Sequence, residues 1–254
     1  MASMSHRTFA DVEALFTTLG ASPTPAVVWY GPGGERTELS GRVLENWVAK
    51  TANLLVEELD TAPGSTIALR APAHWRSLAM GLAAVRTGLV QLPRTDGARE
   101  AEAVPAQVWV GFEAEGAQAR TAQTRLLLAR GALAASYDGA SPLDADAVDY
   151  AAAVRSFADS YDPFDPLDPE LPLEPGEAGL SLGAWLDRAQ EAGQGGVVLG
   201  AVADREADPG LLADWAGLLA DGGTLVLLDP RLERQQRERA LAQEGADAAD
   251  HSGR

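Results

Sequence analysis

The sequence predicts an α/β protein in which mostly parallel sheets are flanked by helices and preceded by a hairpin. Two regions alternate strand, helix and strand, Thr66 to Leu92 and Gly196 to Leu228. This order favours parallel pairing, because a helix crossover returns the chain in the same direction. Ahead of them, the cluster Gly31-Pro32-Gly33-Gly34 forces a turn between the apolar strands 26–30 and 36–39. These three observations define the fold class.

The other elements follow from spacing. Apolar residues at helical intervals predict helices over Phe9 to Leu19 and after Ser40, which is the expected N-cap of the second. Residues 107–112 read as a further strand, and 117–135 and 145–157 as helices. Asp208-Pro209 predicts the start of the helix that ends at Gly222-Gly223, and Asp229-Pro230 the start of a last, charged helix. Five of the tryptophans fall in apolar periodic segments and are predicted to be core: Trp29, Trp47, Trp109, Trp185 and Trp215.

The segment 159–179 separates the two regions. It holds seven carboxylates, five prolines three residues apart and no basic residue. Each proline fixes its own φ and restricts its predecessor, which predicts an extended, polyproline-like surface linker. The sequence therefore predicts a first α/β lobe over 1–158, this linker, a second lobe over 180–248 and a frayed tail over 249–254.

Composition excludes several functions. The net charge is −17 with a pI near 4.5, which makes nucleic acid and anionic membranes unsuitable partners. The chain has no cysteine, so a disulfide, a thiolate nucleophile and a sulfur-based zinc site are excluded. Neither a leader segment nor a membrane-spanning apolar run is evident, so the cytoplasm is the expected location.

The stretch from Glu38 to Pro93 resembles the N-terminal portion of AMP-forming acyl-CoA synthetases, the adenylate-forming or AMP-binding enzymes. The segments that carry the resemblance are LSGRVLENWVAKTANLLVEEL, TIALRAPAHW and AAVRTGLVQLP, and later DWAGLLADGGTLVLLDP, which begins at Asp214. The chain is also similar to a small actinobacterial group of truncated AMP-binding-like proteins of unknown function. The resemblance implies part of the N-terminal domain of adenylate-forming enzymes as the fold.

The resemblance also implies functional elements that the sequence lacks. The family holds ATP phosphates on a Ser/Thr/Gly-rich loop ending in Pro-Lys-Gly, whereas Pro172 to Ala184 reads PLEPGEAGLSLGA, with acids and no lysine. The family's ATP-binding Thr-Gly-Glu, ribose-binding aspartate and catalytic lysine follow in parts that this chain does not contain. The single lysine, Lys50, lies on a predicted helix and is expected to be a solvated surface residue. No catalytic residue is assigned.

Three local patterns remain as candidates. His74 and Trp75 lie where a strand passes into a helix, the edge at which parallel sheets bind ligands, and they are the candidate pocket residues. The bland interpretation makes Trp75 a core residue and His74 an exposed turn residue. Gly179 to Gly183 matches the G-x-S-x-G nucleophile pattern with Ser181, followed by Asp229 and His251, but the preceding segment is acidic instead of a buried strand.

The third pattern is the triplet Asp162, Asp165 and Asp168, whose oxygens suit a hard cation but lack a turn that wraps around it, so that no metal site is assigned. Three hypotheses of function follow. The first is a non-catalytic relative of the synthetases that acts as a binding or interaction module, with a small carboxylate, a homodimer or a partner protein as candidates and no cofactor. The second is a ligase-like enzyme that activates a carboxylic acid, binds ATP or AMP and needs a partner chain. The third is a serine hydrolase that uses Ser181.

Overall fold

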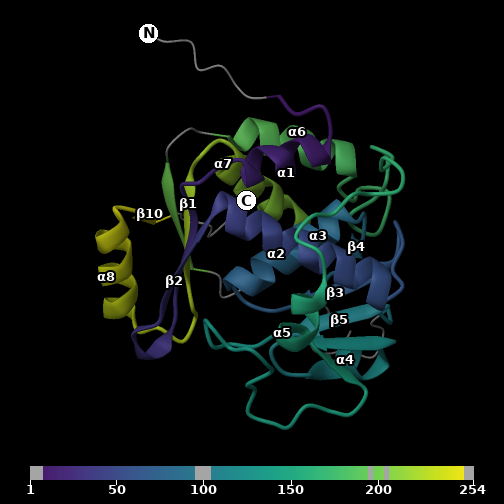
Figure 1. Ribbon diagram of the computed structural model, residues 1–254, viewed down its shortest axis with the longest axis horizontal. Helices are drawn as coiled ribbons and strands as arrows, with labels where there is room; N and C mark the ends of the chain where they lie inside the picture. Colours follow the sequence, from purple (N-terminus) through teal and green to yellow (C-terminus); the bar gives the residue numbers. More distant parts are fainter. Residues whose placement is uncertain (1–7, 95–103, 194–196, 203–205, 249–254) are drawn as a thin grey trace. The chain divides into compact units, whose positions relative to one another are not determined.

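The computed structural model describes residues 8–94, 104–193, 197–202 and 206–248 (Figure 1). They form two compact units, each built around one five-stranded sheet. The first unit consists of Met1–Asn46, Pro72–Trp75 and Gly183–Arg254, and the second of Trp47–Ala71 and Arg76–Leu182. Both sheets are mostly parallel, as the sequence predicts.

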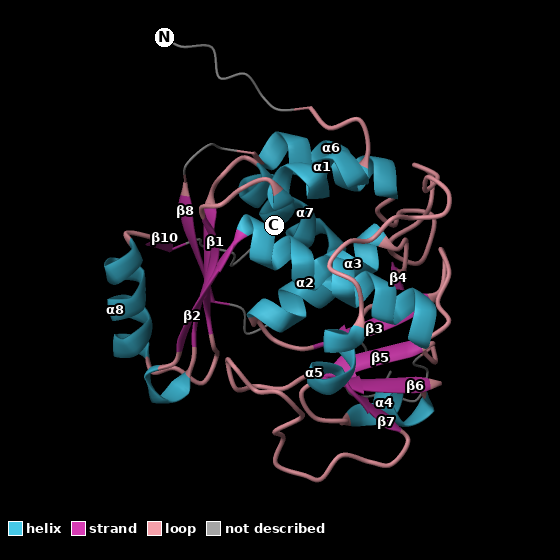
Figure 2. Cartoon of the chain, viewed as in Figure 1, coloured by secondary structure: helices cyan, strands magenta, loops and turns pink. Residues whose placement is uncertain are grey.

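The sheet of the first unit has the order β10-β8-β9-β1-β2. Figure 2 labels β1, β2, β8 and β10 of this sheet. Its strands are β1 (Pro25–Tyr30), β2 (Arg36–Ser40), β8 (Val198–Val202), β9 (Thr224–Leu228) and β10 (Asp247–Ala248). β1 and β2 form the predicted antiparallel hairpin, and the remaining pairs are parallel. β1 therefore joins the N-terminal hairpin to the second βαβ region.

Helices flank this sheet. Asp11 caps α1 (Val12–Gly20) by accepting from the Ala14 N–H at 2.8 Å. α6 (Leu182–Ala192) precedes β8, and Asp208 caps α7 (Pro209–Ala220), as predicted. The face of the sheet that carries Val28, Val226 and Leu228 packs against α8 (Arg234–Glu244).

The start of α8 differs from the prediction. Its N-cap is Glu233, which exchanges hydrogen bonds with Gln236 in a capping box, and not Asp229-Pro230. Asp229 lies four residues upstream, and its carboxylate accepts a hydrogen bond from Arg231. The aspartate–proline pair marks the end of β9 and a turn instead of a helix start.

The sheet of the second unit has the order β4-β3-β5-β6-β7 and is parallel throughout. Its strands are β3 (Thr66–Arg70), β4 (Val90–Gln91), β5 (Val108–Gly111), β6 (Thr124–Leu127) and β7 (Ala147–Asp149). α3 (Trp75–Arg86) connects β3 to β4, which confirms the predicted strand, helix and strand order. α2 (Gly41–Asn53) begins after Ser40, whose Oγ accepts from the Val43 N–H at 3.3 Å, and ends in a π-helical turn over Leu54–Glu58.

Two predicted helices of this unit are right only over part of their length. In place of a helix over 117–135, a short α4 (Gly116–Thr121) leads into β6, and in place of one over 145–157, β7 leads into α5 (Tyr150–Ala153) and a 3₁₀ turn at Val154–Ser156. Both regions are rich in alanine, which suits a helix. Pairing of β6 with β5 and of β7 with β6 buries Leu126 and Leu127, and this tertiary pairing outweighs the local preference.

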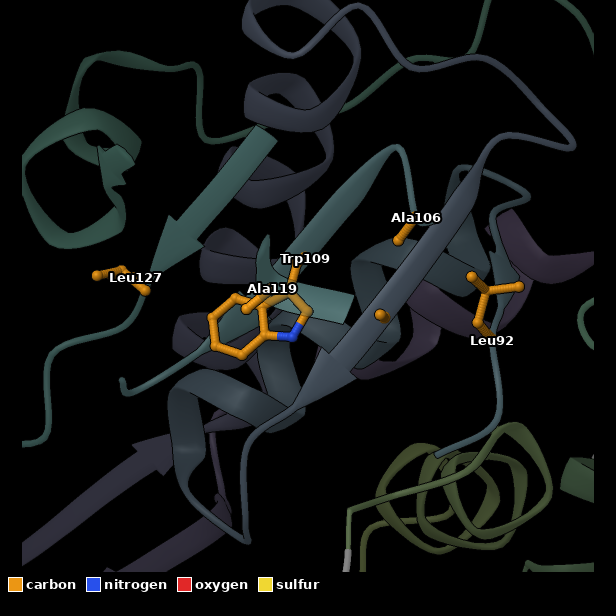
Figure 3. Close-up of a cluster of buried hydrophobic side chains, with 6 residues drawn as sticks. Leu92, Ala106, Trp109, Ala119 and Leu127 are labelled. Carbon is orange, nitrogen blue, oxygen red and sulfur yellow. The ribbon is translucent and has the colours of Figure 1, made fainter. Parts of the chain in front are cut away.

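Figure 3 shows part of the core of the second unit. Trp109 of β5 lies among Ala68, Leu92, Ala106, Ala119 and Leu127. The indole crosses Gly111, where an added Cβ would lie 2.3 Å from Cη2 of Trp109. Close approach by a rigid ring explains why a glycine ends β5.

The boundaries of the two units differ from those of the lobes 1–158 and 180–248 that the sequence predicts. The hairpin β1–β2 pairs with β9, nearly two hundred residues later, and not with the strands that follow it. Residues 159–179, here called the strap, belong to the second unit instead of lying between two lobes. Within the strap, the Leu171 N–H donates to the Asp168 carbonyl in a turn that interrupts the predicted extended arm. The predicted tail 249–254 lies outside the described residues.

Candidate functional site

His74 and Trp75 lie in the first unit, in the connection between β3 and the start of α3. The His74 ring stacks on Trp75 at 5.7 Å between centroids and meets the Trp29 ring at 4.4 Å with a 59° tilt. His74 is 2% exposed and Trp75 3%. The interpretation of His74 as an exposed turn residue is therefore wrong, and Trp75 is a core residue.

The third ring of this aromatic group belongs to β1. Trp29 is fully buried, and its indole lies over Gly31, where a Cβ would come within 2.2 Å of Cη2. Gly31 has an extended backbone with φ −119°, so steric room and not backbone conformation requires glycine here. The end of β1 and the glycine after it thus repeat the Trp-x-Gly arrangement that ends β5.

Asp229 follows β9, next to the end of β1 in the same sheet. Its Oδ1 accepts from the Arg231 backbone N–H at 2.8 Å and from Nε at 2.9 Å, and Oδ2 accepts from Nη2 at 2.9 Å. Burial alone would raise the pKa of Asp229, but the hydrogen bonds from Arg231 outweigh it, and with a smaller contribution from His74 the pKa lies below its ordinary value. The carboxylate is therefore ionised, buried and already neutralised.

A second polar group ties the hairpin to the end of α8. The Tyr30 hydroxyl donates to Glu244 Oε1, and Arg36 Nε donates to the same oxygen at 3.0 Å. Burial raises the pKa of Tyr30, and the hydrogen bond to Glu244 adds to this. Burial likewise would raise the pKa of Glu244, yet its bonds from Arg36 and Tyr30 lower it. This group fastens the last turn of α8 to β1 and β2.

Ser181 lies in the second unit, in a closed turn over 171–182. Ser181 forms an isolated antiparallel bridge with Pro172. In the same turn, the Leu173 N–H donates to the Leu180 carbonyl at 2.8 Å, and the Leu180 N–H donates to Glu174 Oε2 at 3.1 Å. Ser181, the residue before α6, is thus preceded by an acidic turn, and not by the buried parallel strand that a nucleophile elbow requires. Asp229 is engaged by Arg231, and His251 lies outside the described residues.

Lys50 is not a solvated surface residue. Its ammonium donates to the Phe157 carbonyl and pairs with Asp159 at the start of the strap, and its side chain is 21% exposed. Local sequence patterns do not indicate these contacts, because the partners of Lys50 lie more than a hundred residues later in the chain.

The aspartates of the triplet are exposed along the strap. Asp168 Oδ1 accepts from the Glu170 N–H at 2.9 Å, so this carboxylate stabilises the turn. Among the residues that the structure describes, no group of three or more histidine and carboxylate side chains is placed to hold a metal ion. In the same described ranges, no helix is long and apolar enough to cross a membrane.

The candidate site is therefore an aromatic group, Trp29, His74 and Trp75, in the same unit as the ion-paired Asp229. Stacked rings and a buried imidazole are suited to packing against a planar ligand or against other side chains of the protein core. The Asp-x-Arg spacing after a buried strand is the sequence signal that sequence reasoning overlooked.

No family model matches the chain. A curated Mycobacterium tuberculosis (strain ATCC 25618 / H37Rv) protein, described as a TIGR03089 family protein, is 47% identical over 64 residues, which are 24% of this chain and 26% of that protein. This match lies in an actinobacterium, but it covers about a quarter of each chain.

Solved structures match most of the chain. An acyl-CoA synthetase of Brucella canis superposes with a TM-score of 0.65 and 17% identity over 88% of this chain and 43% of its own. The acetoacetyl-CoA synthetase of Streptomyces lividans gives 0.66 and 17% over 92% and 41%. The N-terminal subdomain of Klebsiella oxytoca NpsA, solved with 3-hydroxybenzoyl-AMSN, gives 0.62 and 12% over 97% and 61%.

At these identities the similarity establishes the fold alone. The chain spans between 41% and 61% of these three solved relatives. It has the α/β fold of the N-terminal part of adenylate-forming, acyl-CoA synthetase-like enzymes.

Proposed function

We propose that the chain is a binding or interaction module, without adenylating activity of its own, on the scaffold of the adenylate-forming N-terminal domain. The supporting observation is the closed turn at 171–182, the segment that the resemblance aligns with the phosphate-binding loop. There, a carboxylate of Glu174 accepts the Leu180 N–H, and the N–H groups of Leu173 and Leu182 donate to backbone carbonyls at 2.8 Å. Backbone N–H groups that already donate to oxygens of the protein are not available to bind phosphate oxygens.

Charge supports the same conclusion. Glu174 and Glu177 lie in this turn, and the whole chain carries a charge of −17. Phosphate sites depend on positive charge or on free N–H donors at a helix N-terminus. The remaining candidate ligands are a small carboxylate, whose single charge needs fewer donors than a triphosphate, or a protein.

The test is a thermal-shift series with Mg-ATP, AMP and coenzyme A on the purified chain. A ligand at 100 times its dissociation constant stabilises the folded state by about 2.7 kcal/mol, which raises Tm by roughly 5–10 °C for a protein of this size. We expect no shift with any of the three. A clear shift with ATP or AMP would overturn the proposal.

A second candidate is a ligase-like enzyme that activates a carboxylic acid with machinery supplied by a partner chain. It is favoured by the NpsA subdomain, which was solved in complex with 3-hydroxybenzoyl-AMSN. This chain covers 61% of that subdomain, a larger share than of the other two solved structures. Calorimetric titration of the chain with that compound separates the candidates. Saturable binding would support the ligase, and no heat of binding would favour the module.

A further inference from the structure

The strap is fastened to its own unit at its first end. Lys50 holds the Phe157 carbonyl and Asp159, and the Asn53 amide donates to the carbonyls of Ala158 at 3.1 Å and Ser160 at 2.9 Å. The next residue, Tyr161, lies under the Arg86 guanidinium, with 5.3 Å from Cζ to the ring centroid. The chain is thus fixed as far as residue 161.

The far end of the strap is fastened by leucines. Leu173 is fully buried, and its carbonyl accepts from the Gln91 N–H of β4 at 2.8 Å. Leu171 and Leu167 pack over Gly88, since an added Cβ there would lie 2.5 Å from Cδ2 of Leu171 and 3.3 Å from Cδ2 of Leu167. Gly88 also has φ +71°, so the site requires glycine twice over.

Between these anchors one aromatic side chain points into solvent. Phe164 is 100% exposed, whereas Phe16 and Phe112 are buried and the remaining two phenylalanines are partly buried. Asp162 and Asp165 on either side of it are exposed as well. An unburied phenylalanine in an anchored segment forgoes the stabilisation that burial of such a side chain contributes.

We propose that the strap is a docking segment, with Phe164 as its apolar anchor, for a separate protein whose surface has an apolar centre bordered by arginine or lysine. The proposal deepens the interaction-module function and rests on it. Aromatic anchors dominate many protein interfaces, and flanking charges select the partner. Because both ends of the strap are already fixed, binding orders few additional residues.

Charge decides the kind of partner. From Asp159 to Gly179 the strap carries seven carboxylates and no basic residue, so a nucleic acid or an anionic lipid surface would be repelled. A second copy of this chain carries a charge of −17 and would be repelled too. A basic protein surface is the complementary one.

The experiment uses a synthetic peptide of alternating arginine and leucine as a probe, with glutamate–leucine and arginine–serine versions beside it. Binding to the full chain is measured by fluorescence anisotropy at physiological salt. Fluorophenylalanine incorporated at the five phenylalanines gives a fluorine NMR signal for position 164. We expect the arginine–leucine peptide to bind and to shift that signal.

The matched variants are Phe164→Ala and Leu133→Ala, the second at an apolar residue that is 89% exposed outside the strap. Phe164→Ala should weaken binding about tenfold or more, and Leu133→Ala should not. Equal binding by wild type and Phe164→Ala would reveal general attraction to an acidic protein and overturn the proposal, as would no binding. A nucleotide-induced thermal shift would contradict the proposed function without changing this comparison.

Discussion

The carboxylate of Asp229 accepts three hydrogen bonds from Arg231, two residues later, directly after β9 ends. The aspartate side chain is 7% exposed and the arginine side chain 48%. A nearly buried charge is thus neutralised by a partner that reaches it from solvent. This pair holds the turn beside the aromatic group of His74, Trp29 and Trp75.

Arg231→Met should destabilise the protein by about 1–3 kcal/mol, because it leaves a buried carboxylate with fewer donors. Urea unfolding at neutral pH measures this. The control is Arg234→Met, which removes an exposed pair with Glu238 and should change the midpoint little. Equal effects of the two variants would mean that burial of Asp229 is not important.

The same pair predicts a dependence on acid. Since Arg231 holds the pKa of Asp229 below its ordinary value, its stabilisation is complete above the ordinary aspartate range and is lost as pH falls through the lower folded pKa. Asp229→Asn should lack this part of the acid dependence. A pH series of unfolding midpoints, from neutral to about pH 3, compares the variant with wild type over the range in which aspartate titrates.

Gly31 and Gly111 supply a paired test of packing. A Cβ at either position would lie within 2.3 Å of the indole two residues earlier, and those rings are in the core. Gly31→Ala and Gly111→Ala should each cost about 1–3 kcal/mol, as overpacking does. Gly193→Ala, whose Cβ would make an ordinary contact at 3.5 Å, is the control and should be nearly neutral. Neutral outcomes at Gly31 and Gly111 would show that the indoles move aside.

Local signals predicted the elements that depend on neighbours in sequence. The glycine–proline cluster at 31–34 encodes the hairpin, and alternating strand and helix patterns encode both βαβ regions. β6 was missed because its four residues lie in an alanine-rich stretch, and only pairing with β5 makes them a strand. Lys50 and Asp159 were not paired, since contacts across a hundred residues leave no periodic trace.

The candidate site was predictable only in part. The position of His74 and Trp75 at a strand-to-helix connection follows from the pattern, but the burial of His74 depends on Trp29 from another strand. The neutralisation of Asp229 was also not foreseen, because an aspartate before a proline resembles a helix cap.

Lys50→Met should loosen the first end of the strap without unfolding the protein. Its ion pair with Asp159 is largely exposed on the acid side, so the global cost is expected to be about 1 kcal/mol or less. Local opening should rise, because the Phe157 carbonyl loses its donor. Limited chymotrypsin digestion should cut after Tyr161 and Phe164 several times faster. Lys50→Arg, which keeps a cationic donor, is the control, and unchanged cleavage in Lys50→Met would show that Asn53 and Arg86 are sufficient to fix this end of the strap.

Tyr150 gives a prediction at alkaline pH. It is fully buried, and burial raises its pKa to about 12 from an ordinary value of 10.0. Its hydroxyl lies 2.7 Å from Thr51 Oγ1, which donates to the Trp47 carbonyl and therefore accepts from the tyrosine. Since the folded state favours the neutral phenol, the stability contributed by Tyr150 is complete below pH 10 and is lost as pH rises towards about 12.

Tyr150→Phe should cost about 1 kcal/mol near pH 8, where the hydrogen bond to Thr51 is intact. The difference from wild type should shrink above pH 10, since the variant has no phenol to ionise there. Circular dichroism of thermal unfolding measures the difference, and near-ultraviolet absorbance follows tyrosinate formation. If the wild-type minus variant spectrum showed Tyr150 ionising at its ordinary pKa while the fold remained intact, the phenol would be reached by solvent, and the packing of α5 against Thr51 would be looser than this structure requires.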